Sequence, residues 1–151
     1  MDVEKESFNM LISSVYDFYS ICQWPHDVNS LYVGEGVGML KVWDEREGKD
    51  LSFWELHEDR INSVDFSPEN MHLMTTSSTD GLACIWDLRR MKKHKPESIK
   101  SVNHNRAVHS ASFSPSGKYL ATTRSVENNQ GHTFLTICLF MATSMYKYRN
   151  W

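Results

Sequence analysis

Short runs of alternating apolar and polar residues, separated by turn-forming residues, fill the middle of the chain. Ile61, Val64 and Phe66 form one such run, and a second follows at residues 82–86. Runs this short, bounded by Pro, Gly, Asn and Asp, predict β-strands rather than helices. The intervening Asp80-Gly81 suits a tight hairpin, because glycine adopts positive φ without strain. We therefore expect an all-β chain built from short antiparallel strands.

The strand pattern recurs along the chain. At an offset of 47 residues, His57 aligns with His104 and Pro68 with Pro115. The same offset aligns Leu73 with Leu120, Thr75 with Thr122, and Thr76 with Thr123. At an offset of 43 residues, Trp43-Asp44 aligns with Trp86-Asp87. A period of this size, with a Trp-Asp pair and an upstream His, is typical of WD repeats, whose units form the four-stranded blades of a β-propeller.

Resemblance to WD repeats implies a structural role for four polar residues. In such repeats a loop His, a strand Ser or Thr, a turn Asp and a strand Trp form one hydrogen-bonded chain. The corresponding residues here are His57, Thr76 (or Ser78), Asp80 and Trp86. A buried network of this kind fixes a blade when every member has a partner. A catalytic His57–Asp80 dyad is disfavoured, because no nucleophile stands at motif spacing.

The repeat pattern weakens at both ends. Val37 stands where the first repeat should have its turn Asp, and no Trp-Asp pair follows Thr123. At about 43 residues per blade the chain holds roughly three and a half blades, whereas propellers close with roughly four to eight. We expect a propeller fragment of roughly three incomplete blades. Its origin would be a truncated product, which is a fragment, a splice form or a gene model that reads past an exon end. The expected divisions are an N-terminal segment at 1–14, the propeller fragment at 15–123 and an irregular tail at 124–151.

Composition narrows the function classes. The net charge is −3, so any contact with nucleic acid requires a local basic patch. Cys22, Cys84 and Cys138 form no CxxC pair, which disfavours zinc and disulfides and favours a reduced intracellular compartment. The longest apolar-leaning run, Phe134–Tyr146, is too short to span a bilayer as a helix. Without a phosphate-binding loop or nucleophile elbow, we expect no enzyme activity, cofactor, metal, small-molecule substrate or membrane contact.

The amino-acid sequence between the repeat motifs supports a narrower resemblance. It rests on residues 31–46, 57–63, 77–89 and 113–123. Over about residues 20–123 the chain resembles the WD-repeat family of DNA damage-binding protein 2 and WD repeat-containing protein 76. The resemblance implies a nuclear protein that binds DNA or chromatin. It also implies a substrate receptor that joins a cullin-4 ubiquitin ligase through the propeller adaptor of that ligase.

Two surfaces follow from this resemblance. The adaptor-binding box of the family has the length and ending of Met74–Arg89, which makes Trp86, Asp87 and Arg89 candidate contacts. Loops on the opposite rim supply the DNA-binding candidates Arg60, His104, Asn105, Arg106 and Arg124. At each surface, the alternative is that these candidates are ordinary solvated side chains with no binding role. A protein-interaction propeller with no nucleic-acid role, or a truncated product with no independent function, also fits the sequence.

Overall fold

A computed structural model of the chain describes residues 15–92, 94–127 and 133–142. The strands in these ranges are β1 (Phe18–Gln23), β2 (Ser30–Glu35), β3 (Met39–Asp44), β4 (Lys49–Glu55), β5 (Ile61–Phe66), β6 (Leu73–Ser78), β7 (Leu82–Asp87), β8 (Lys100–Asn103), β9 (Val108–Phe113), β10 (Tyr119–Glu127) and β11 (Thr133–Met141). A single turn of 3-10 helix, η1 (Leu88–Arg90), follows β7.

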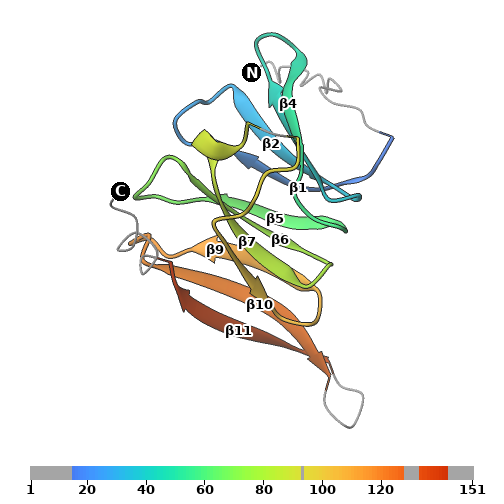
Figure 1. Cartoon of the computed structure of the whole chain (residues 1–151), viewed down its shortest axis with the longest axis vertical. Helices are drawn as coiled ribbons and strands as arrows, with labels where there is room; N and C mark the ends of the chain where they lie inside the picture. Colours follow the sequence, from blue (N-terminus) through green and yellow to red (C-terminus); the bar gives the residue numbers. More distant parts are fainter. Residues whose placement is uncertain (1–14, 93, 128–132, 143–151) are drawn as a thin grey trace, which may run out of the picture.

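The strands form three antiparallel sheets, in the orders β1-β2-β3-β4, β5-β6-β7-β8 and β9-β10-β11. We call them the first, second and third blade. The blades stack face to face in chain order, with the second blade between the other two (Figure 1). This is the all-β propeller-fragment architecture expected from the repeat pattern.

The hairpins within blades depend on glycine. Gly81, between β6 and β7, has a φ of 91°, and Gly38, between β2 and β3, has a φ of 77°. A Cβ added at Gly38 would lie 2.0 Å from the carbonyl oxygen of His57. No other residue avoids both the strained φ and this clash. The turn therefore brings the first blade against the loop that enters the second.

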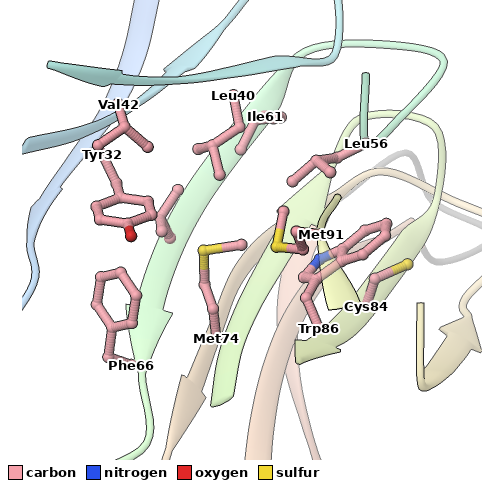
Figure 2. Close-up of a cluster of buried hydrophobic side chains, with 11 residues drawn as sticks. Tyr32, Leu40, Val42, Leu56, Ile61, Phe66, Met74, Cys84, Trp86 and Met91 are labelled. Atoms are coloured by element: carbon pink, nitrogen blue, oxygen red, sulfur yellow. The ribbon is translucent and has the colours of Figure 1, made fainter. Parts of the chain in front are cut away.

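The larger apolar core lies between the first and second blades. Figure 2 shows Tyr32, Leu40 and Val42 on one side of this core, facing Phe66 and other side chains of the second blade. Tyr32 and Phe66 meet edge to face, with 4.9 Å between their ring centroids. A second core between the second and third blades contains Leu73, Ala83, Ile85, Val108, Ala111, Leu120 and Ala142. Burial of these faces is the main force that holds the blades together.

The expectation of an irregular tail from residue 124 is wrong for part of that range. β10 continues to Glu127, and β11 runs from Thr133 to Met141. The two strands pair without a register shift from Tyr119–Met141 to Glu127–Thr133. Backbone hydrogen bonds make this ladder, so it forms although the Trp-Asp pair is missing. Residues 1–14, 128–132 and 143–151 of the expected segments lie outside the described residues.

The structure also corrects the alignment of the second and third blades. Thr76 pairs with Val64 in the second blade, and Thr122 pairs with Ala111 at the equivalent place in the third. The offset in this strand is therefore 46 residues rather than 47. The connection between β9 and β10 is one residue shorter than that between β5 and β6. Because side chains alternate between faces, this single residue decides which threonine points into the blade interface.

Candidate functional site

The four polar residues of the second blade form one connected network. His57 Nδ1 lies 2.9 Å from Asp80 Oδ2, and His57 Nε2 lies 2.7 Å from Thr76 Oγ1. Trp86 Nε1 donates to the same Thr76 Oγ1 at 2.8 Å. An ionised carboxylate only accepts, so Nδ1 carries a proton and donates to Asp80, while Nε2 forms a hydrogen bond with the Thr76 hydroxyl. Every polar atom of the network then has a partner, which suits a structural rather than a catalytic role.

The environment of Asp80 favours its ionised form. Burial by itself would raise the pKa of the Asp80 carboxyl. The hydrogen bond and charge of His57, together with the backbone N–H groups of Leu82 and Glu58, outweigh burial and hold that pKa below its ordinary value. The Ser78 hydroxyl supports the turn, since it donates to the Asp59 carbonyl at 2.9 Å and accepts from the Asp80 N–H at 3.1 Å.

The first blade has the tryptophan of this network but not the threonine. Trp43 pairs with Leu31 as Trp86 pairs with Met74, which places Val33 at the position of Thr76. Valine has no acceptor. Within the described ranges, the buried Nε1 of Trp43 has no hydrogen-bond partner.

The third blade has the threonine but not the tryptophan. His104 Nε2 lies 3.0 Å from Thr122 Oγ1. Phe140 pairs with Leu120 and so takes the position of Trp86. Its ring meets that of His104 edge to face at 5.7 Å, as the Trp86 ring meets His57 at 6.1 Å. Burial and the nearby positive charge of Arg124 lower the pKa of His104 and so disfavour the protonated form of its ring.

The rim candidates differ in how the structure places them. Arg60 Nε donates to Asn62 Oδ1 at 2.9 Å and to Thr79 Oγ1 at 3.2 Å, and its guanidinium lies 4.6 Å from the Tyr19 ring centroid. These contacts hold Arg60 in one orientation. Sequence reasoning missed Tyr19, because nothing in the repeat pattern marks that position as a partner of Arg60.

The other rim candidates lie on the third blade and its entry loop. The side chain of Arg106 is exposed, and that of Arg124 donates from Nη1 to the His104 carbonyl at 3.1 Å. Asn105 is also exposed and adopts a φ of 55°. His104 is only 6% exposed and packs inside the blade, so the structure removes its ring from the rim surface.

The adaptor candidates are mostly buried. Trp86 is 3% exposed and Asp87 is 5% exposed, whereas the Arg89 side chain is 57% exposed. Arg89 Nε and Nη2 donate to the two Asp87 oxygens at 2.9 and 2.7 Å. The hydrogen bond from Arg89 is the largest cause of the lowered pKa of Asp87. Of the three candidates, Arg89 alone presents its functional group to solvent.

Neither a metal-binding cluster nor a membrane-spanning helix is present in the described residues. In these ranges no cluster of three His, Cys, Asp or Glu side chains could hold a metal ion. Nor does the described part of the chain contain a helix that is long and apolar enough to cross a membrane.

Comparison with known proteins identifies the repeats. The family model "WD domain, G-beta repeat" matches residues 48–87 and 96–130. DNA damage-binding protein 2 of Mus musculus is 36% identical over 97 residues, which cover 64% of this chain and 22% of that protein. Pre-mRNA-processing factor 19 homolog 2 of Arabidopsis thaliana is 29% identical over 107 residues, which cover 71% and 19%. The chain thus spans about a fifth of the length of these curated relatives.

Solved structures show the same fold. A chain of the crystal structure of the mitotic checkpoint complex superposes with a TM-score of 0.66, at 21% identity, over 89% of this chain and 36% of that chain.

Proposed function

Because this chain belongs to the WD-repeat family, we propose that it is a non-catalytic scaffold that binds DNA or chromatin through the loops at one end of its blades. The second-blade network supports the scaffold role, since His57 and Asp80 are committed to internal hydrogen bonds. A relative whose name is DNA damage-binding protein 2 supports the choice of DNA.

One observation carries the choice of surface. Arg60 and Arg106 lie on the loops that enter the second and third blades, and both loops meet the β6–β7 hairpin. The Thr79 N–H donates to the Arg60 carbonyl at 3.0 Å, and the His104 N–H donates to the Gly81 carbonyl at 2.9 Å. The two arginines therefore stand at the same end of the blades, where guanidinium groups can bind phosphate oxygens. Glu58 and Asp59 lie beside Arg60 in the sequence and add negative charge at this end of the blades. Binding therefore depends on the guanidinium groups of Arg60 and Arg106 themselves.

The test is binding of a fluorescent DNA duplex, followed by anisotropy at several salt concentrations. We expect Arg60→Gln and Arg106→Gln each to weaken binding and to reduce the slope of log affinity against log salt by about one. Lys92→Gln is the matched control, because Lys92 is exposed beyond β7, at the other end of the strands. Binding that is absent, independent of salt, or equally weakened by the control would contradict the proposal.

A second candidate function rests on Arg89. Its guanidinium is held by Asp87 and exposed beside the end of β7, so it is accessible to a partner, and we propose the adaptor of a cullin-4 ubiquitin ligase as that partner. Capture of the purified adaptor should be lost with Arg89→Ala and retained with Arg90→Ala.

Nuclear location accompanies both candidates and is supported by the names of the relatives. Capture of another protein that resists nuclease, without DNA binding, would favour a general interaction scaffold instead.

A further inference from the structure

The first strand of a blade contains a β-bulge in both the first and the second blade. The register of β1 against β2 shifts by one residue at Tyr19, and that of β5 against β6 shifts at Asn62. A bulge interrupts the alternation of side chains between faces and so changes the direction in which the extra residue points. Both of these extra residues contact the same side chain, which is that of Arg60.

Asn62 holds the Arg60 side chain through its amide. Asn62 Oδ1 accepts from Arg60 Nε at 2.9 Å. Asn62 Nδ2 donates to the Val108 carbonyl at 2.8 Å and to Thr79 Oγ1 at 3.1 Å. Because a carbonyl oxygen only accepts, the contact with Val108 decides which end of the amide faces Arg60. Arg60 Nε is thereby tied both to the third blade, where Val108 begins β9, and to the β6–β7 hairpin, which contains Thr79.

Tyr19 covers one face of the same guanidinium. Arg60 Cζ lies 4.6 Å from the centroid of the Tyr19 ring, which is within the range of a cation–π contact. The ring restricts the flat face of the guanidinium, and the acceptors of Asn62 and Thr79 restrict its Nε edge. A long side chain that is mobile before binding loses conformational freedom when it binds, and this weakens affinity. In this chain Arg60 is ordered before any ligand binds.

The remaining N–H groups of Arg60 suit an oxyanion. A guanidinium has five N–H groups, and the one at Nε is used by Asn62 and Thr79. Among the described residues, nothing accepts a hydrogen bond from the Nη atoms of Arg60 or forms an ion pair with it. The neighbouring Asp59 carboxylate accepts instead from the Arg60 backbone N–H, at 2.7 Å. Adjacent N–H groups on Nη1 and Nη2 match two oxygens of one phosphate.

We propose that Tyr19 and Asn62 are positioning residues that hold Arg60 for a bidentate contact with one phosphate of the DNA backbone. This inference rests on the function proposed above and specifies how the arginine is used. Its Nη edge meets the phosphate, while its Nε edge stays hydrogen-bonded to the protein. Tyr19 and Asn62 act through Arg60 and need not touch the DNA.

The test is a double-mutant cycle on the binding of the fluorescent duplex by the whole chain. We expect Asn62→Leu and Tyr19→Leu each to weaken binding about 3- to 10-fold, because Arg60 must then be ordered when DNA binds. Neither variant should change the slope of log affinity against log salt, since both keep the cation at position 60. In an Arg60→Gln background the same two changes should have no further effect. Tyr19→Phe keeps the ring and should bind as the wild type does.

A measurement without DNA checks the orientation of Arg60 itself. The hydrogen-bonded Nε–H of Arg60 should exchange slowly with water in the proton–nitrogen NMR spectrum of the free chain, and Asn62→Leu should abolish this protection. Rapid exchange in the wild-type chain would contradict the proposed orientation.

The possible outcomes separate this inference from the proposed function. Binding that is weakened by Arg60→Gln but not by Asn62→Leu or Tyr19→Leu would overturn the positioning role alone and leave DNA binding intact. Losses that keep their full size in the Arg60→Gln background would also overturn it, because Tyr19 and Asn62 would then act independently of Arg60. A chain that binds no DNA would overturn both proposals.

Discussion

Thr76→Val removes the central member of the second-blade network and keeps its shape. The Thr76 hydroxyl bonds both Trp86 Nε1 and His57 Nε2, at 2.8 and 2.7 Å, and all three residues are buried. Valine leaves both nitrogens without a partner. Each such group costs about 1–3 kcal/mol, so with two of them we expect the free energy of unfolding to fall by about 2–6 kcal/mol. This is a large share of the roughly 5–15 kcal/mol that stabilises a typical domain.

Equilibrium unfolding in urea, followed by tryptophan fluorescence, measures this loss. Thr123→Val is the matched control, because Thr123 lies on the opposite face of β10 from Thr122 and outside the network. The reverse change, Val33→Thr, should give Trp43 Nε1 an acceptor and raise stability by about 1 kcal/mol. If Thr76→Val and Thr123→Val cost the same within about 0.5 kcal/mol, the network does not stabilise the blade and the reasoning is refuted.

Three further results are expected. Gly38→Ala should lower the free energy of unfolding by more than about 3 kcal/mol, since its Cβ would lie 2.0 Å from the His57 carbonyl oxygen. Gly48→Ala should lower it by about 1 kcal/mol, because Gly48 has a φ of 61° but open space around its Cβ. Chemical denaturation of the two variants measures both losses. The pKa of His104 is lowered from 6.5, so its contribution to the free energy of unfolding is present above that pH and is lost as the pH falls through the pKa of the folded state. The Tm should therefore drop on acidification below pH 6.5, and it should drop less in His104→Gln. The pKa of Asp80 is lowered from 3.8, so its contribution to the free energy of unfolding is lost only below that pH. Asp80→Asn should make this second decrease smaller, and the lowered pKa of Asp87 contributes to what remains.

The sequence could predict the second blade because its chemistry recurs at fixed spacing. Thr76, Asp80 and Trp86 follow His57 at intervals set by strand length and hairpin geometry, so a pattern of residue types stands for a pattern of contacts. The structure brings these four residues together. An alternating pattern also predicts which side chains share a face of a strand, since successive residues point to opposite faces; in β6 both faces are buried.

The third blade could not be predicted in the same way. β11 pairs with β10 through backbone atoms, which carry no residue signature, and Phe140 replaces the expected Trp. The turn before β10 is one residue shorter than its counterpart, and a turn can lose a residue without changing the apolar pattern around it. The contact of Arg60 with Tyr19 joins two blades, and repeat spacing contains no information on such pairs.

The three blades form a natural series of the same network. The second blade has all four members, the first has Val33 in place of the threonine, and the third has Phe140 in place of the tryptophan. The complete network occurs where a blade is packed on both sides, and there Trp86 is only 3% exposed. An unpaired polar group costs most where water cannot reach it, so burial on both faces makes the complete set most valuable in the middle blade. Phe140 lies on the face of the third blade that packs on the second, so a blade can lose a network member on a covered face as well.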